Sequence, residues 1–181
     1  AVENTREMVR QYRNHPSIVL WSLGNEAGAG INAEAMRDTI VRLDPTRPPF
    51  YDSDRRCSAI YDDSYLYPDE MKRVAERVTD RPFMMREYCH AMGNGPGDLE
   101  DYFQCIERHP GHCGAFVWEW CDHAIDLGKT IKGKKVYVYG NDHGEYPNDG
   151  NLCVDGLVYP DRRPSTGLME YKNVHRPARI V

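Results

Sequence analysis

The stretch Val19-Leu20-Trp21-Ser22-Leu23-Gly24-Asn25-Glu26 constrains the fold most, because it is an apolar run that stops abruptly at a polar Asn-Glu pair. A buried strand of a parallel sheet has this composition when it carries a carboxylate to the rim of the sheet. The stretch Pro82-Phe83-Met84-Met85-Arg86-Glu87 is built in the same way. Two carboxylates at the ends of two apolar strands suggest an active site with paired carboxylates.

Strands and helices are expected to alternate through the first two thirds of the chain. Apolar periodicity predicts helices over 3–13, 33–43, 70–78 and 99–107, and strands over 17–23, 49–53, 58–62, 83–87 and 114–118. Alternation at this spacing implies a parallel sheet. Polar residues follow the strands, as in Asn25-Glu26, Asp52-Ser53, Asp62-Asp63, Glu87 and Glu119. A (β/α)₈ barrel keeps its active site at this end of its strands.

The length of 181 residues is short for a whole barrel, which typically needs about 250. Five strands after a lone helix instead predict an α/β fold that holds the later strands and helices of a TIM barrel. The prediction treats 1–181 as one partial catalytic domain, with a long loop over about 123–163, a hairpin through 136–139 and a last helix over 166–174. A doubly wound sheet is the alternative, but no Gly-rich phosphate fingerprint follows the first strand.

Composition excludes several classes of partner. The net charge of −5 argues against nucleic-acid binding, and the absence of an apolar run near eighteen residues argues against a membrane span. The six cysteines form no C-x-x-C pair and several lie in apolar runs, which predicts buried reduced thiols in a reducing, cytoplasmic location.

Cleavage of a glycosidic bond needs a proton donor on one side of the bond and a carboxylate on the other side of the sugar. In retaining enzymes the two carboxyl groups lie about 5–5.5 Å apart. Glu26 and Glu87 are 61 positions apart (87 − 26), so only a fold that closes on itself brings them together. Taken singly, each glutamate is more simply a solvated surface charge.

Four blocks in order carry a resemblance to a known family. The blocks are Asn14-His15-Pro16-Ser17-Ile18-Val19-Leu20-Trp21-Ser22-Leu23-Gly24-Asn25-Glu26-Ala27-Gly28, Glu87-Tyr88-Cys89-His90-Ala91-Met92-Gly93-Asn94, Gly114-Ala115-Phe116-Val117-Trp118-Glu119-Trp120-Cys121-Asp122 and Pro147-Asn148-Asp149-Gly150-Asn151-Leu152-Cys153-Val154-Asp155-Gly156-Leu157-Val158. Together they resemble the glycoside hydrolase family 2 β-galactosidases over nearly the whole chain.

The resemblance implies a role for each matching residue. Glu26 is expected to be the general acid/base, and Glu87 the nucleophile. Asn25 is expected to hydrogen-bond the sugar 2-hydroxyl.

Three further residues match positions of the family's sugar site. The resemblance implies that His90 contacts a sugar hydroxyl and that Trp118 forms an apolar wall for the ring. Tyr65 best matches a tyrosine that assists the nucleophile, and Tyr67 is its rival. Trp21 and Trp120 are interpreted as structural.

The family's metal sites are implied only in part. Its magnesium site uses the acid/base glutamate, here Glu26, with other ligands upstream of this chain. Its monovalent-cation site uses a backbone carbonyl and an Asn in the last block, where this sequence has Leu152 and Asp155. Magnesium is therefore expected in the full-length parent, and sodium is possible through Asp155. His109, His112 and His123 have no spacing typical of metal ligands.

The resulting hypothesis is hydrolysis of terminal non-reducing β-D-galactose with retention of configuration. The chain alone is expected to be weakly active or inactive, and its open sheet edges to be covered by a homo-oligomer or by the missing part of the parent chain. Alternatives are a β-glucuronidase-like or other family 2 glycosidase and a non-catalytic carbohydrate-binding fragment. A Cys-His hydrolase that uses Cys89 or Cys113 is a third, poorly supported one.

Overall fold

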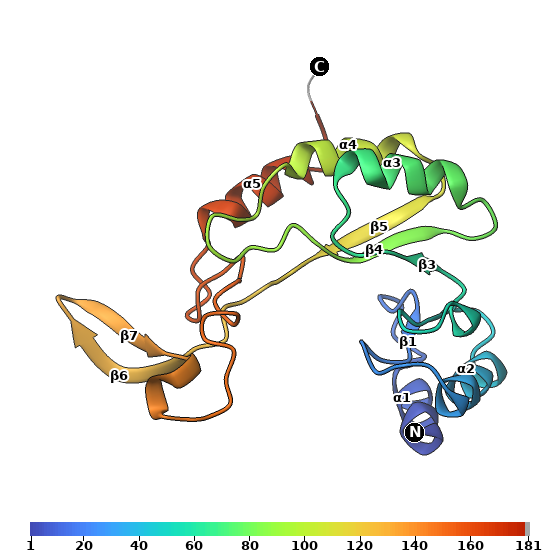
Figure 1. Ribbon diagram of the computed structural model, residues 1–181, viewed down its shortest axis with the longest axis horizontal. Coiled ribbons are helices and arrows are strands. Elements are labelled where there is room, and N and C mark those ends of the chain that lie inside the picture. Colours follow the sequence, from blue (N-terminus) through green and yellow to red (C-terminus); the bar gives the residue numbers. More distant parts are fainter. Residues whose placement is uncertain (180–181) are drawn as a thin grey trace. The chain divides into compact units, whose positions relative to one another are not determined.

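The computed structural model describes residues 1–179, and helices and strands alternate over 2–117 (Figure 1). The helices are α1 (Val2–Tyr12), α2 (Ile31–Leu43), α3 (Pro68–Arg77), α4 (Leu99–Arg108) and α5 (Thr166–Val174), with the short 3₁₀ turns η1 (Arg55–Cys57) and η2 (Gly140–His143). The strands are β1 (Trp21–Ser22), β2 (Pro49–Phe50), β3 (Tyr61–Asp62), β4 (Phe83–Tyr88), β5 (His112–Val117), β6 (Ile125–Ile131) and β7 (Lys134–Val138).

The first five strands form two separate sheets, and within each sheet neighbouring strands follow chain order. β1 pairs with β2 in parallel, with Trp21 opposite Pro49, and β3 pairs with β4 in parallel, with Tyr61 opposite Phe83. The strand orders are β1-β2 and β3-β4-β5, so residues 1–179 form a mixed α/β fold and no closed barrel. The expected parallel α/β arrangement is confirmed, whereas barrel closure is not seen in the described chain.

The chain divides into two compact units, each described below by itself. The first unit comprises 1–63, 72–84 and 109–114, and the second comprises 64–71, 85–108 and 115–181. β4 and β5 begin in the first unit and end in the second.

The first unit packs α1 against α2 around one apolar cluster. Its buried members are Val9, Trp21, Leu23, Ala33, Ile40, Tyr51 and Cys57. The indole N–H of Trp21 donates to Asp44 Oδ2 at 2.9 Å, which satisfies the polar end of a 3 % exposed side chain. Hydrogen bonds from Thr46, Trp21 and Arg47 hold the pKa of the Asp44 carboxyl well below its usual range. Trp21 is therefore structural, as predicted.

The second unit places α4 beside α5 (Figure 1). Tyr88 on β4 meets Tyr102 on α4 edge to face, with ring centroids 5.4 Å apart. His175, the C-cap of α5, packs against the Phe103 ring at 5.2 Å. Arg179, which follows α5, donates two hydrogen bonds to the Glu100 carboxylate on α4, at 2.5 and 3.0 Å.

A separate two-stranded sheet, β6 and β7, lies in the segment over 123–163 for which the sequence predicts a long loop. The expected hairpin through 136–139 is present, since β7 pairs antiparallel with β6. The two residues between these strands, Lys132 and Gly133, both have positive φ angles of 51° and 76°. Two left-handed residues form the hairpin turn that matches strand twist, so Lys132-Gly133 joins the two strands directly.

The six cysteines differ in burial. All six cysteines are free thiols; Cys57, Cys105 and Cys121 are buried and Cys113 is exposed. The burial expected of the thiols thus holds for three of them and fails for Cys113. None of the described helices combines the length and the apolar character needed to cross a membrane.

Candidate active site

Glu26 lies in the first unit, on the loop that follows β1. Its backbone N–H donates to Asp52 Oδ2 at 3.0 Å. Its φ angle of 51° is left-handed, which is uncommon for a residue with a side chain. The Asn25 and Glu26 side chains are both exposed. The expected acid/base is thus presented to solvent from a loop that is held by its backbone.

Glu87 lies in the second unit, near the end of β4, and its side chain is only 14 % exposed. Arg86 Nη1 is 3.5 Å from Glu87 Oε1. The Tyr65 backbone N–H donates to the Glu87 carbonyl at 3.0 Å, and the Tyr65 hydroxyl hydrogen-bonds with the Glu87 carboxylate. Burial and then this bond raise the pKa of the Tyr65 hydroxyl well above its usual value, so Tyr65 keeps its proton.

The two rival tyrosines therefore differ in position. Tyr65 contacts Glu87 through its backbone and its hydroxyl. Tyr67 is 68 % exposed, and its backbone N–H donates to Glu70 at the start of α3. The structure brings Tyr65, rather than Tyr67, to the expected nucleophile.

Trp118 and His90 converge on one buried carboxylate. The Trp118 indole N–H donates to Asp155 Oδ2 at 3.0 Å, and His90 Nε2 lies 3.8 Å from the same oxygen. The Met92 N–H donates to His90 Nδ1, so the proton of a neutral His90 ring is on Nε2, toward Asp155. Asp155 is 1 % exposed and orients both expected sugar-contacting residues.

Backbone hydrogen bonds extend the sheet beyond the residues of the named strands. Trp118 N–H donates to the Tyr88 carbonyl at 3.1 Å, and Glu119 N–H donates to the Asp155 carbonyl at 2.9 Å. Cys121 then forms a parallel bridge with Val158. The segment around Asp155 therefore lies beside the continuation of β5, where the next strand of the sheet would lie. The sequence analysis did not predict this strand-like segment.

Glu119 faces Asp155 in this part of the second unit. Burial and then the neighbouring Asp155 carboxylate raise the pKa of Glu119 to about 7. Glu119 Oε2 is also 3.2 Å from His123 Nε2. Because like charges at close range disfavour double ionisation, Glu119 binds a proton readily near neutral pH.

A cavity of about 350 Å³ opens beside this cluster in the second unit. Its lining includes four acidic residues and no Lys or Arg: Trp118, Glu119, His123, Gly140, Glu145, Asn148, Asp149, Gly150, Leu152, Cys153 and Asp155. Asp155 Oδ1 is buried and accepts no hydrogen bond. An acceptor of this kind fits a cation or a hydroxyl donor, although residues 1–179 contain no cluster of three or more ligating side chains arranged for a metal ion.

The expected site residues thus fall into two groups. Tyr65, Glu87, His90, Trp118 and Asp155 all belong to the second unit, whereas Asn25 and Glu26 belong to the first. The structure brings the five together through shared hydrogen bonds and ring contacts; Tyr65 and His90, for example, have ring centroids 5.9 Å apart. The approach of Glu26 to Glu87 stays a prediction.

Three residues near the site were missed as contacts by the sequence analysis. Asp52 holds the Glu26 backbone, Arg86 faces Glu87, and Asp155 joins Trp118 to His90. The position of Asp52 directly after a strand, like that of Glu26, was the available signal. Arg86 is a charge inside an apolar strand, which also marks a functional position.

The cysteine alternative finds no support in the geometry. Burial raises the pKa of the Cys89 thiol to about 12, and its Sγ donates to the Gly97 carbonyl. Partial desolvation by neighbouring atoms also raises the pKa of the Cys113 thiol, although the residue is exposed as a whole. A nucleophilic cysteine needs a lowered pKa, so neither thiol is activated.

A partial parallel α/β sheet with carboxylates after its strands is typical of a segment of a (β/α)₈ barrel enzyme. The chain belongs to glycoside hydrolase family 2, since the family described as "Glycosyl hydrolases family 2, TIM barrel domain" matches residues 1–180. It is 45 % identical over 181 residues to the β-galactosidase of Actinobacillus pleuropneumoniae, covering 94 % of this chain and 18 % of that protein. The β-galactosidase of Staphylococcus xylosus is 41 % identical over 192 residues, with 99 % of this chain and 19 % of that protein covered. The chain thus spans about a fifth of the length of these curated relatives.

Solved structures share the fold at lower identity. An FMN-binding β-glucuronidase from Facaelibacterium prausnitzii L2-6 superposes with a TM-score of 0.67 at 18 % identity, over 99 % of this chain and 32 % of that one. A family 2 β-galacturonidase from Eisenbergiella tayi, bound to galacturonate, gives a TM-score of 0.64 at 19 % identity, over 98 % of this chain and 36 % of that one. The described residues therefore have the fold of part of a family 2 barrel.

Proposed function

We propose that this chain supplies the catalytic strand ends of a retaining β-galactosidase that removes terminal non-reducing β-D-galactose. The observation that carries the proposal is the largely buried Glu87 carboxylate, held between the Tyr65 hydroxyl and Arg86 at the end of β4. A carboxylate fixed in this way is suited to attack a sugar carbon.

The proposed reaction has two displacements. Glu87 attacks the anomeric carbon while Glu26 gives its proton to the leaving oxygen, so the glycosidic bond breaks and a galactosyl ester of Glu87 forms. Glu26 then takes a proton from water, which attacks the anomeric carbon and releases Glu87. The Tyr65 hydroxyl orients the Glu87 carboxylate before attack and again after its release.

Neutral sugars are the proposed substrate class. Glu119 and Asp155 contribute carboxyl groups to the cavity beside Trp118, and no Lys or Arg lines it. A negative wall repels the carboxylate of a uronic acid and accepts hydrogen bonds from sugar hydroxyls. This favours a galactoside over a glucuronide, in agreement with the names of the two curated relatives cited above. His90 and Trp118 are the proposed hydroxyl contact and ring wall.

The complete polypeptide is proposed to hold what this chain does not supply. Glu26 would contribute to a magnesium site with ligands from elsewhere in the polypeptide, where the metal would screen nearby negative charge. Asp155 Oδ1 would be available to a monovalent cation. The chain by itself is proposed to be weakly active or inactive, with its sheet edges covered by further barrel strands or by another copy.

Trapping of the covalent intermediate tests the proposal. In the complete polypeptide, a 2-deoxy-2-fluoro-β-galactosyl donor with a good leaving group should label the peptide that contains Glu87, as found by mass spectrometry. Glu87→Gln should abolish the label and lower kcat for an aryl β-galactoside by roughly 10⁴-fold or more. A label on another carboxylate, or full activity of Glu87→Gln, would show that the nucleophile is misassigned.

A further inference from the structure

The loop that carries Glu26 is held to the segment after β2 at two points. The Glu26 backbone N–H donates to Asp52 Oδ2 at 3.0 Å, and the Tyr51 hydroxyl donates to the Gly28 carbonyl at 2.5 Å. Tyr51 is 4 % exposed, so one of these two anchors belongs to the core. The backbone is therefore fixed on both sides of Ala27.

The Asp52 bond continues the β1–β2 ladder beyond the ends of the strands. The last backbone rung joins the Leu23 N–H to the Phe50 carbonyl at 3.0 Å. Beyond it, the Glu26 backbone turns into the left-handed region, with φ 51°, which is disfavoured for a residue with a side chain. A side-chain oxygen of Asp52 takes the place of the next carbonyl and holds that conformation.

Asp52 is itself held in place. The Ser53 hydroxyl donates to the same Oδ2 atom at 3.1 Å, and Oδ1 is shielded from solvent. The Asp52 carboxylate therefore has a defined direction.

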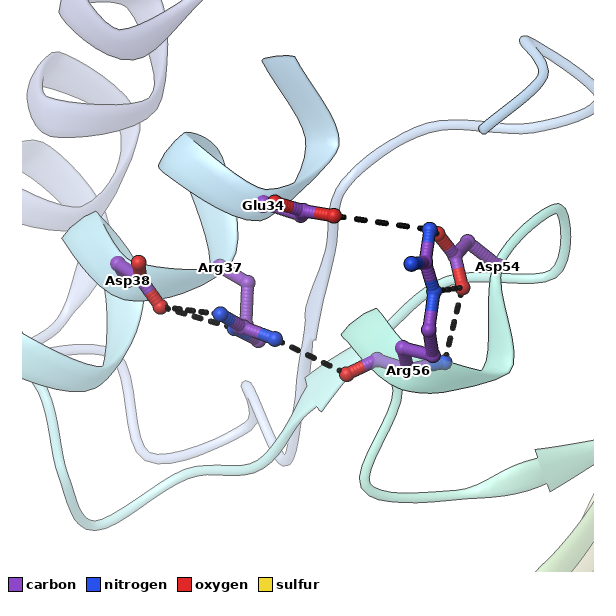
Figure 2. Close-up of polar contacts among 5 residues, drawn as sticks. All are labelled: Glu34, Arg37, Asp38, Asp54 and Arg56. Atoms are coloured by element: carbon purple, nitrogen blue, oxygen red, sulfur yellow. Dashed lines mark hydrogen bonds and ion pairs between the residues drawn. The ribbon is translucent and has the colours of Figure 1, made fainter. Parts of the chain in front are cut away.

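The residues after Asp52 are tied to the helix that follows the Glu26 loop (Figure 2). Asp54 accepts bonds from Arg56, and Arg56 lies 3.5 Å from Glu34 on α2. Arg37 on α2 donates to the Arg56 carbonyl at 3.1 Å. Because α2 begins at Ile31, this network connects the chain on the far side of the Glu26 loop to the chain after Asp52.

We propose that Asp52 is a positioning residue for Glu26, and that it acts on the proton-transfer step alone. The inference rests on the proposed function, in which Glu26 is the general acid/base. A proton donor works only within hydrogen-bond reach of the leaving oxygen, and a displacement of about 1 Å can lower the rate by about 10²-fold. Asp52 fixes the backbone from which the Glu26 carboxyl reaches that oxygen.

A leaving-group series on the complete polypeptide tests this role. Asp52→Ala should lower kcat/KM by about 10- to 100-fold for alkyl β-galactosides, whose leaving groups need protonation. It should lower kcat/KM by no more than about threefold for the dinitrophenyl galactoside, whose leaving group does not. Asp52→Asn keeps an acceptor oxygen and should stay within about threefold of the wild type throughout.

Asp80→Ala is the matched control, since it removes an aspartate carboxylate of the same unit whose side chain is 65 % exposed and which accepts a bond from Arg81. It should leave the leaving-group dependence unchanged. Hydrogen exchange of the peptide over 22–30 should become faster in Asp52→Ala and not in Asp80→Ala. If Asp52→Ala does not fold, Asp52→Ser, whose hydroxyl does not reach Glu26, is measured in its place.

Glu26→Ala, measured in parallel, separates the positioning role of Asp52 from the acid/base role of Glu26. A uniform loss for Asp52→Ala across the series, or no loss, overturns the positioning role when Glu26→Ala shows steep leaving-group dependence. A flat series for Glu26→Ala overturns the acid/base assignment itself, whatever Asp52→Ala does.

Discussion

The surroundings of Glu26 and those of Glu87 differ in what holds the carboxylate. The Glu87 side chain is 14 % exposed and is contacted by the Tyr65 hydroxyl and by Arg86. Glu26 is exposed, and its backbone N–H is held by the Asp52 carboxylate.

This difference matches the two proposed roles. A nucleophile must stay ionised and aimed at one carbon, which suits an enclosed site with fixed partners. An acid/base must lose and regain a proton in each turnover, which suits a carboxyl group open to water on a fixed backbone. The comparison teaches that one scaffold can enclose one proposed catalytic carboxylate among side chains and present the other from an anchored loop.

The strongest way to break this comparison is to remove each carboxylate and add azide. Glu87→Ala should lose at least about 10⁴-fold in kcat with every leaving group, and azide should restore turnover with α-galactosyl azide as product. Glu26→Ala should lose about 10²- to 10⁴-fold with poor leaving groups, and azide should give the β-anomer. Proton NMR coupling at the anomeric position identifies the products, and the same anomer from both variants would contradict the two roles.

A smaller effect tests whether Glu87 depends on its side-chain partner. Tyr65→Phe removes the hydroxyl that bonds the Glu87 carboxylate and should lower kcat by about 10²- to 10³-fold, the usual cost of losing one preorganised donor. Tyr67→Phe is the matched control, because Tyr67 is 68 % exposed, and it should stay within about twofold. Equal losses in the two variants would refute the assignment of Tyr65.

The smallest expected effect is on stability, and it has opposite signs in the two units. Burial lowers the pKa of His112 in the first unit to about 4. Between pH 6.5 and pH 4 the unfolded chain therefore binds a proton at His112 that the folded unit does not bind, and the folded unit loses stability as the pH falls. At pH 5 this costs about 2 kcal/mol of stability. The pKa of Glu119 in the second unit is raised to about 7, so the folded unit gains stability as the pH falls from 7 toward 4.5.

Hydrogen exchange at pH 7 and pH 5, corrected for intrinsic rates, measures this difference. Acidification should loosen peptides of the first unit while those around Glu119 become better protected. His112→Phe should remove the first response, and Glu119→Gln the second. Parallel changes in both units would contradict the pKa assignments.

Local patterns were sufficient to predict most elements near the two carboxylates. The expected helices over 33–43 and 166–174 appear as α2 and α5, and β4 begins at Phe83 as predicted. The strand expected over 17–23 is reduced to Trp21–Ser22, because residues 1–179 place a partner on only one of its edges. An apolar run shows that a segment is buried, but its neighbours decide how much of it pairs.

The missed features have identifiable physical causes. β6 lacks the alternation typical of a strand, since Gly128 and charged residues interrupt it; the turn Lys132-Gly133 was the usable signal. Asp155 joins His90 to Trp118 across long stretches of sequence, and no local period encodes such a contact. Only the resemblance drew attention to this position, and it suggested a cation ligand rather than a partner of an indole.

The bond between the Trp118 indole and Asp155 has an optical consequence. The chain has three tryptophans; Trp21 is enclosed in the first unit and Trp120 is 59 % exposed. Trp118 lines the cavity of the second unit with its N–H directed at a carboxylate. Its emission wavelength therefore responds to whatever enters the cavity, and a chain that keeps Trp118 while Trp21 and Trp120 become Phe would report occupancy without an added label.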